Sequence, residues 1–308
     1  MINIALCTDI YYMMACGPCV ISIFEHHKNT PCHIYVVYKE LLENDKNALK
    51  EIARRYGQEL TLVPIDSAVF MNLKVNDRFR ESIYYRLLLP NLLPDLDKII
   101  YLDCDIVLNG SLEEFWNVDI DGYACGVVED QESDDIILHN RIGVYDTYFN
   151  SGVILFNMNY WRKNNVLEDV VNYIYDNPEK CIYPDQDAMN AILHGKVKFC
   201  PYGYNFQDLW HTTEYRWIRL HNSKFKEVDR WKDCPVVVHF AGDNKPWFAD
   251  TCHPFKQYYL DCLAKTPWKL PKVRSKRNDR HKYIRRFNRM LILAIVEAVV
   301  FVLYIILS

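Results

Sequence analysis

The spacing of apolar and polar residues predicts that strands and helices alternate along the first part of the chain. Short apolar runs at Ile2–Cys7, Ile34–Tyr38 and Leu60–Val63 are typical of buried strands. Between them, the stretches Ala15–His27 and Glu43–Tyr56 are typical of helices. This alternation favours an α/β fold, in which a mixed and mostly parallel sheet has helices on both faces.

Polar residues follow three of the expected strands, at the point where each strand ends. Open sheets of this class bind ligands at the carboxyl ends of their strands. The chemistry of the chain is therefore expected where these ends meet. The residues concerned are Thr8 and Asp9 after the first strand, Asp103, Cys104 and Asp105 after Lys98–Leu102, and His239 with Gly242 after three valines.

The overall charge limits the classes of partner. The 308 residues include 36 Lys and Arg and 40 Asp and Glu, which gives a formal net charge of -4. Binding to nucleic acid usually needs a basic surface, so we expect no nucleic-acid partner. The length suits one large domain with a sizeable core.

The positive charge is concentrated near the C-terminus. Nine Lys and Arg residues lie between Lys272 and Arg289, opposed only by Asp279, and the run Leu291–Leu307 that follows is apolar except for Glu297. A helix needs about 20 apolar residues to span a bilayer. The run therefore fits a segment that spans a membrane, lies in its interface or pairs with a second copy. A buried core helix is the alternative, although such a helix normally has a polar face.

These features divide the chain into a body, residues 1–264, and a tail, residues 265–308, made of a basic linker and an apolar membrane-associating helix. Basic residues beside a membrane segment are typical of its cytoplasmic side. The N-terminus shows no secretory signal, and the eleven cysteines lack the spacing of a disulfide framework. We therefore expect the protein at the cytoplasmic face of the cell membrane, peripheral or anchored by its tail.

Asp103 and Asp105 are two residues apart at the end of a strand, so both side chains are expected to point to one side. Carboxylates are the preferred ligands of hard divalent cations, which are often shared with the phosphates of a nucleotide. An imidazole suits Mn²⁺ better than Ca²⁺, so His239 would direct the site towards manganese. Lys245 lies close enough in sequence to His239 to meet a phosphate.

Four motifs in this order resemble those of the retaining glycosyltransferases of family 8, in particular the bacterial lipooligosaccharide and lipopolysaccharide galactosyl- and glucosyltransferases. Spaced along the chain, these four motifs extend the resemblance over roughly residues 1–255. They are Tyr101–Asn109, which contains Asp-Cys-Asp, then Tyr148–Asn157, Tyr183–Asn190 with Asp-Gln-Asp, and His239–Trp247.

The resemblance implies a GT-A fold, UDP-galactose or UDP-glucose as donor, Mn²⁺ or alternatively Mg²⁺, and hexose transfer to a saccharide acceptor with retention. That acceptor would belong to lipopolysaccharide-like glycan synthesis and would be lipid-linked if the tail binds membrane. By position, the metal ligands are Asp103, Asp105 and His239, and the donor contacts are Thr8, Asp9, Tyr11, Arg86, Cys104, Asn150, Gly242 and Lys245. Family members often have Asp and Asn where this chain has Thr8 and Ile10.

Three residues are implied in catalysis by the same resemblance: Gln186, Asp185 and Asp130. Retaining hydrolases use a carboxylate nucleophile. Here the position nearest the anomeric carbon matches Gln186, whose amide is a poor nucleophile. This favours attack by the acceptor from the side of the leaving phosphate, with covalent catalysis by Asp185 or Asp130 as the alternative.

Other features have competing interpretations. Cys16-Gly-Pro-Cys19 has the spacing of a thioredoxin active site, so a dithiol oxidoreductase is an alternative function. A non-catalytic UDP-sugar-binding protein is another. Zinc binding by Cys16, Cys19, His26, His27, Cys32 and His33 is disfavoured by their irregular spacing.

The region that meets the acceptor is the least defined by sequence. Residues 132–145 are expected to form a loop near it. An aromatic platform that stacks on a sugar is an alternative to core packing for Tyr202, Tyr204, Phe206, Trp210, Tyr215, Trp217 and Trp231.

Overall fold

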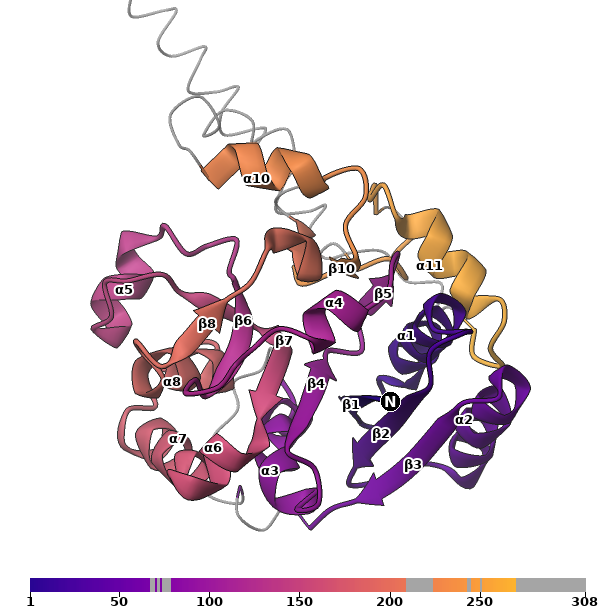
Figure 1. The fold of residues 1–308 in the computed structure, drawn as a ribbon, viewed down its shortest axis with the longest axis horizontal. Coiled ribbons are helices and arrows are strands. Elements are labelled where there is room, and N and C mark those ends of the chain that lie inside the picture. The colour runs from indigo at the N-terminus through magenta and orange to yellow at the C-terminus, as the bar shows by residue number, and fades with distance from the viewer. Residues whose placement is uncertain are drawn as a thin grey trace, which may run out of the picture.

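The structure is a computed structural model that describes residues 1–66, 70, 73, 79–208, 224–242, 245–249 and 251–269. Its strands are β1 (Ile2–Thr8), β2 (Cys32–Tyr38), β3 (Glu59–Pro64), β4 (Lys98–Leu102), β5 (Ile106–Leu108), β6 (Cys125–Glu129), β7 (Phe149–Asn157), β8 (Val197–Phe199), β9 (Phe206–Gln207) and β10 (Val237–His239). A seven-stranded sheet has the order β3-β2-β1-β4-β7-β6-β8, and a second sheet has the order β5-β10-β9 (Figure 1).

Helices cover both faces of the large sheet, as the sequence predicts. The α-helices are α1 (Met13–His26), α2 (Glu43–Tyr56), α3 (Leu89–Leu92), α4 (Glu113–Trp116), α5 (Ile136–Ile142), α6 (Met158–Lys163), α7 (Val166–Asp176), α8 (Pro184–Ile192), α10 (Lys224–Trp231) and α11 (Lys256–Leu263), and the 3-10 helices are η2 (Glu81–Leu88) and η3 (Tyr202–Tyr204). Helices α1, α2 and α11 contribute to one core, whereas η2, α6, α7 and α8 contribute to the other.

Strand β1 is covered on both faces, and its sequence is apolar except at Asn3 and Thr8. Ile4 and Leu6 point into the first core, while Ala5 and Cys7 point into the second. Because successive side chains of a strand alternate between faces, a central strand that is covered on both sides needs apolar side chains at most of its positions. The strand is therefore buried nearly throughout, and the residues that follow it emerge at the edge of the sheet.

One reversed strand brings a further motif to that edge. Four neighbouring pairs of the sheet are parallel, but β7 runs antiparallel to both β4 and β6. The beginning of β7, with Asn150 and Ser151, therefore lies at the same edge as the ends of β4 and β6. The prediction of a mixed and mostly parallel sheet is confirmed.

The predicted loop at residues 132–145 is wrong in part, because it contains helix α5. The helix begins after Asp135, whose side chain accepts a hydrogen bond from the N–H of Ile137, and it ends at Gly143 with φ 74°. Both are ordinary helix boundaries, an aspartate N-cap and a left-handed glycine. The helix has only seven residues, which is too short to give a periodic apolar pattern.

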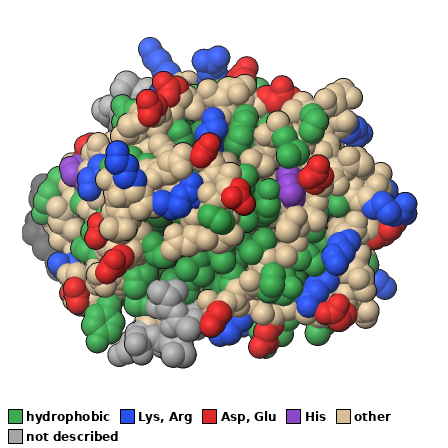
Figure 2. Space-filling model, turned by 60° about the horizontal axis from the view of Figure 1, so that its bottom comes forward, with side chains coloured by type: hydrophobic (Ala, Val, Ile, Leu, Met, Phe, Trp, Pro, Cys, Tyr) green, Lys and Arg blue, Asp and Glu red, His purple; other side chains and the backbone are tan. Residues whose placement is uncertain are grey.

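Figure 2 shows one face of the molecule, on which acidic and basic side chains are interspersed and apolar side chains lie between them. Across the part of the chain that the structure describes, no helix has both the length and the apolar character needed to cross a membrane. The predicted basic cluster and the apolar run Leu291–Leu307 lie outside the described residues.

Candidate active site

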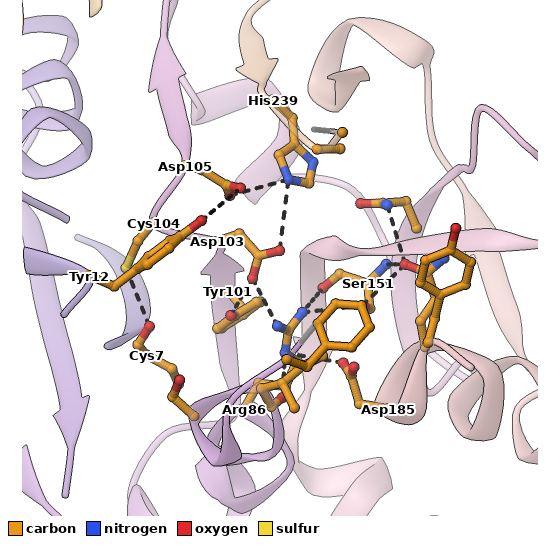
Figure 3. A pocket seen from close by; sticks show the side chains of 18 of the residues that line it. Cys7, Tyr12, Arg86, Tyr101, Asp103, Cys104, Asp105, Ser151, Asp185 and His239 are labelled. Atoms are coloured by element: carbon orange, nitrogen blue, oxygen red, sulfur yellow. Dashed lines mark hydrogen bonds and ion pairs between the residues drawn. The ribbon is translucent and has the colours of Figure 1, made fainter. Parts of the chain in front are cut away.

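A cavity of about 640 Å³ lies at the edge where the parallel strands end. Its wall contains residues from elements far apart in the sequence, which converge as Figure 3 shows. Asp9 follows β1, Asp103 and Asp105 follow β4, and Asp130 follows β6, while His239 ends β10. The carboxyl-edge rule for open sheets therefore locates the cavity correctly.

Three of these side chains form a cluster with the composition of a metal site. Nε2 of His239 lies 3.4 Å from Oδ1 of Asp105 and 3.7 Å from Oδ2 of Asp103. One ligand atom from each residue lies within 4.8 Å of the other two. Strand pairing explains the approach, since His239 is opposite Ile106 in the antiparallel pair of β10 with β5. Two carboxylates and an imidazole suit a divalent cation such as Mn²⁺.

Gly152 leaves the space in which this cluster is held. A Cβ atom at position 152 would lie 2.3 Å from Cε1 of His239 and 2.7 Å from Oδ2 of Asp103. The backbone carbonyl of Gly152 also accepts a hydrogen bond of 2.8 Å from the N–H of Asp103. Only glycine therefore fits at this point of β7, and the cradle that it leaves supports the cluster as a binding site.

Asn205 fixes the orientation of the imidazole. Its Oδ1 lies 2.8 Å from Nδ1 of His239, and its Nδ2 donates to Oδ1 of Asn150 at 2.9 Å. An oxygen at Nδ1 requires the proton there, which leaves Nε2 free to face the two aspartates. Asn205 is fully buried and was not predicted from the sequence.

Arg86 connects Asp103 of the candidate metal site to the fully buried carboxylate of Asp185. Its guanidinium lies 2.9 Å from Oδ1 of Asp103 and 3.3 Å from Oδ2 of Asp185, and it donates to the carbonyl of Ser151 at 2.7 Å. Burial acts to lower the pKa of Arg86, but the two carboxylates outweigh it and the pKa is raised. Burial raises the pKa of Asp185 to about 6, against the opposing charge of Arg86.

Asn150, Gln186 and Asp130 form the opposite side of the cavity as one hydrogen-bonded group. Nδ2 of Asn150 donates to Asp130 at 2.8 Å and to Oε1 of Gln186 at 3.2 Å. Nε2 of Gln186 also donates to Asp130, at 3.2 Å. Burial raises the pKa of Asp130 despite these bonds. The predicted catalytic residues Gln186, Asp185 and Asp130 therefore all line the cavity.

Lys245 approaches the cluster from the glycine turn after β10. Its ammonium pairs with Oδ2 of Asp105 and donates to the carbonyl of Phe240. Burial acts to raise the pKa of Asp105, but Lys245 and His239 together lower it below its ordinary value. Gly242 and Lys245 both line the cavity, as predicted.

The residues predicted to meet the nucleoside are only partly at the cavity. Asp9 lines it, and its carboxylate accepts hydrogen bonds from the N–H of Tyr11 at 2.9 Å and from Ser82 at 3.1 Å. Thr8 is buried behind the wall, and Tyr11 is 61% exposed outside it, with Arg80 over its ring. The lining residue is instead Tyr12, whose hydroxyl donates to Asp105 at 3.4 Å. Cys104, which was also predicted, lines the cavity too.

The sequence is similar to that of known glycosyltransferases. The sequence matches glycosyl transferase family 8 over residues 3–251. The chain belongs to this family. It is similar to general stress protein A of Bacillus subtilis, 26% identical over 86% of this chain and 94% of the relative. It is also similar to the lipopolysaccharide 1,2-glucosyltransferase of Escherichia coli, 25% identical over 87% and 79% of the two chains.

The fold of this family 8 chain has a solved counterpart. The crystal structure of the galactosyltransferase LgtC with donor and acceptor sugar analogues has a TM-score of 0.78, at 22% identity, over 88% of this chain and 98% of that one. The predicted GT-A fold is confirmed by this likeness, and the family match confirms the predicted function class of a glycosyltransferase.

The redox alternative does not fit a family 8 chain, and the structure contradicts it. Cys16 and Cys19 lie within helix α1, and both are completely buried. Burial raises the pKa of Cys19 well above its ordinary value. A redox-active dithiol needs an accessible thiolate, so these cysteines are core residues.

The structure also gives no zinc site at the described cysteines and histidines near α1. Among the described residues, only Asp103, Asp105 and His239 form a group with metal-ligand spacing. His26 pairs with the hydroxyl of Tyr258 at 3.0 Å, and His27 lies 2.7 Å from the carbonyl of Ile23. Their ring nitrogens thus have protein partners, as is usual for histidines near a core.

Core packing also accounts for the aromatic residues that had been considered as a sugar platform. Tyr202, Tyr204 and Phe206 are buried, and Tyr204 stacks on Phe115 with ring centroids 5.0 Å apart. The ring centroids of Trp231 and Tyr204 are 6.2 Å apart. The other three, Trp210, Tyr215 and Trp217, lie outside the described residues. Among the described residues, the Tyr and Phe side chains that line the cavity are Tyr12, Phe79, Tyr101 and Tyr183.

Proposed function

We propose that this family 8 enzyme transfers galactose or glucose from a UDP-sugar to a hydroxyl group of a saccharide, with retention of the anomeric configuration. The observation that carries the proposal is the cluster of Asp103, Asp105 and His239 in the wall of the cavity. Its chemistry suits a cation shared with a diphosphate, and Lys245 adds a second positive group beside it. A glucosyltransferase among the relatives supports a hexose as the transferred group.

Asp103, Asp105 and His239 would hold Mn²⁺, or alternatively Mg²⁺. When bound there, the cation would act as a Lewis acid on the diphosphate leaving group. Lys245 would neutralise further negative charge on the same group, because its ammonium already lies at this cluster. Asp9 would bind the nucleoside from the other end of the cavity, where Ser82 fixes its carboxylate.

Gln186 is proposed to lie against the anomeric carbon. Its Oε1 accepts hydrogen bonds from the N–H of Ser151 at 2.9 Å and from Asn150 at 3.2 Å, which hold the amide in place. A neutral amide stabilises positive charge on the sugar without forming a stable covalent bond. The acceptor hydroxyl would then attack from the side of the departing phosphate, and that phosphate would take its proton.

Asp130 and Asp185 are the candidates for the alternative covalent route. Asp185 has no exposed surface and faces Arg86, while Asp130 is held by Asn150 and Gln186. Both are therefore better placed to orient Arg86 and Gln186 than to attack. Trapping a glycosyl-enzyme by mass spectrometry would favour the covalent route.

The tail is proposed to hold the enzyme at the cytoplasmic face of the cell membrane, where a lipid-linked saccharide of a lipopolysaccharide-like glycan would be the acceptor. The support is in the sequence: nine basic residues precede the apolar run Leu291–Leu307. Anionic lipids attract such clusters, and the apolar run adds burial. Attachment would raise the enzyme concentration near a membrane-bound acceptor.

The test is release of UDP from a panel of UDP-sugars, measured with Mn²⁺ and with excess chelator. We expect release from UDP-galactose or UDP-glucose that depends on Mn²⁺ and that Asp105→Asn lowers by at least about 100-fold, since a metal ligand is lost. Asp121→Asn, an exposed turn residue, is the control. Release that is equal with and without chelator would refute the proposed cation. Binding of UDP-sugar without any release would favour the non-catalytic alternative.

A further inference from the structure

The cavity wall holds a further buried carboxylate, Asp208, which the sequence did not single out. Asp208 follows β9, is only 3% exposed and lines the cavity together with Lys245 and Gly242. Among the described residues, neither of its oxygens completes a hydrogen bond. Nε2 of His253 lies 3.5 Å from Oδ1, which is at the outer limit for such a bond. A buried carboxylate is costly unless a cation is close to it.

The glycine turn after β10 holds this carboxylate at the wall. A Cβ atom at Gly242 would lie 3.1 Å from Oδ2 of Asp208, and the backbone amide of Gly242 faces the same group. Burial raises the pKa of Asp208 to about 7, and the strongest influence against it is the charge of Lys245. Asp208 and Lys245 both line the cavity, and the charge of Lys245 opposes the effect of burial on Asp208.

Lys245 has a competing partner at the proposed metal site. Its ammonium pairs with Oδ2 of Asp105, whose Oδ1 lies 3.4 Å from His239. A divalent cation bound by Asp103, Asp105 and His239 would share Asp105 with Lys245, and two like charges at one carboxylate repel each other. The lysine side chain is long and is 17% exposed, so it can move to another acceptor within the cavity.

We propose that Asp208 is a positioning residue that receives the ammonium of Lys245 when a divalent cation binds at Asp105, and that it thereby keeps the lysine beside the diphosphate. This inference rests on the proposed function, because it requires the cation and the nucleotide diphosphate. Lys245 would then have two alternative carboxylate partners in the cavity wall, Asp105 and Asp208. Without Asp208, a lysine that the cation displaces from Asp105 would lose this buried carboxylate as an acceptor.

A purely structural role for Asp208 makes a different prediction. If Asp208 only pairs with His253 in the wall, its replacement changes the stability of the fold and does not depend on Lys245. If Asp208 attracts the cation directly through its charge, its replacement weakens cation binding equally whether or not Lys245 is present. Only the exchange of Lys245 between two carboxylates couples Asp208, Lys245 and the cation.

The experiment is a double-mutant cycle on the full chain, with Mn²⁺ affinity measured by electron paramagnetic resonance and no nucleotide present. The proteins are the wild type, Asp208→Asn, Lys245→Met and the double variant. We expect Asp208→Asn to weaken Mn²⁺ binding on the order of tenfold. Lys245→Met should strengthen it, because the competitor is removed. In the Lys245→Met background, Asp208→Asn should change the affinity by less than about twofold.

The remaining outcomes overturn the proposal. Equal weakening by Asp208→Asn in both backgrounds would mean that Asp208 acts by its own charge alone. An unchanged affinity, with only a lower unfolding temperature, would mean a structural role. Asp121→Asn, an exposed acid, is the control for nonspecific loss of negative charge. Failure of the wild type itself to bind Mn²⁺ would instead refute the proposed function, and this result is distinct from the others.

Discussion

The carboxylates of the cavity differ in how strongly their surroundings favour the charged form. Burial acts to raise the pKa of both Asp105 and Asp185, but at Asp105 the charges of Lys245 and His239 outweigh it and the pKa is lowered. At Asp185 the charge of Arg86 only partly opposes burial, and the pKa is raised to about 6. Groups of one type with divergent pKa values are a common feature of catalytic sites. Here the lowered pKa keeps Asp105 charged and suited to binding a cation, whereas the pKa of Asp185 is raised towards neutral pH.

Asp185 should make stability depend on pH. Its folded-state pKa of about 6 is above its ordinary value of 3.8. The folded chain therefore binds this proton more tightly, which stabilises it fully below pH about 4, and the stabilisation is lost as pH rises through about 6. The variant Asp185→Asn has no carboxyl group at this position, so its stability does not contain this pH-dependent contribution. The free energy of unfolding of the variant minus that of the wild type should rise by roughly 1–3 kcal/mol between pH 4 and 7.

Urea denaturation in the presence of chelator at several pH values measures this difference. Arg86 remains charged throughout, so its altered pairing in the variant shifts the difference by a constant amount. A difference that does not change with pH would show that Asp185 keeps an ordinary pKa in the folded chain.

Gly152 should be essential for cation binding. In Gly152→Ala the new Cβ would lie 2.3 Å from His239 and 2.7 Å from Asp103, which is closer than atoms approach in folded proteins. The ligands must move apart, and we expect Mn²⁺ affinity to fall at least about tenfold, as when metal ligands lose their supporting groups. The matched control is Gly110→Ala, whose Cβ would make ordinary contact with Val236 at 3.5 Å. Similar affinities in the two variants would contradict the proposed ligand set.

At the scale of the elements, helix α1 shows how a motif can mislead. Cys16-Gly-Pro-Cys19 has the spacing of a redox site, but it is part of a helix packed against α11 and β5. A Cβ at Gly17 would lie 2.4 Å from the ring of Trp268, so glycine is needed for the close approach of the segment after α11. The indole of Trp268 also donates to Asp45 of α2 at 2.8 Å. The motif therefore serves packing.

Alkylation of the native protein should follow burial. Cys234 and Cys252 are exposed and Cys200 is intermediate, whereas the other eight of the eleven free cysteines are buried. We expect iodoacetamide to modify Cys234 and Cys252 first, and Cys16 and Cys19 only after unfolding in urea, as measured by peptide mass spectrometry. Sugar transfer should survive the native treatment. Modification of Cys16 or Cys19 in the folded protein would revive the dithiol interpretation.

The elements also show which parts of the site the sequence could predict. Strand ends marked by Asp103, Asp105 and His239 were identifiable because apolar runs precede them. Asn205 and Asp208 follow the short helix η3 and flank a strand of two residues, β9, so no periodic pattern indicates their position. Tyr11 and Tyr12 are adjacent and of one type, and only the geometry of the turn after β1 decides which of them lines the cavity.

At the scale of the whole molecule, the fold class followed from local patterns, but the convergence of the site did not. The reversed strand β7 pairs with β4, more than fifty residues earlier in the chain, and β10 pairs with β5, more than one hundred residues earlier. Such pairing depends on packing across the chain and leaves no signal in the spacing of nearby residues. The resemblance to family 8 supplied this long-range information, and it assigned His239 to the site correctly as a neighbour of Asp103 and Asp105.

The tail is strongly basic, whereas the rest of the molecule is acidic. The packing of the body extends to Lys265, which pairs with Glu25 at 2.6 Å, and to Trp268, so a chain that ends at Pro271 keeps these contacts. That variant should fold and retain Mn²⁺-dependent release of UDP. Nine basic residues, each worth about 1 kcal/mol near an anionic surface, should be lost with the apolar run.

Cosedimentation with vesicles of phosphatidylcholine and phosphatidylserine would separate the two contributions. The full chain should bind and the shortened chain should not. A full-length variant with Arg280, Lys282, Arg285 and Arg286 changed to glutamine should bind more weakly and respond less to salt, because only the electrostatic part depends on ionic strength. Equal binding by the full and shortened chains would remove the tail from membrane attachment. The acidic body would then have to reach its acceptor by diffusion, and a soluble saccharide would become the better candidate.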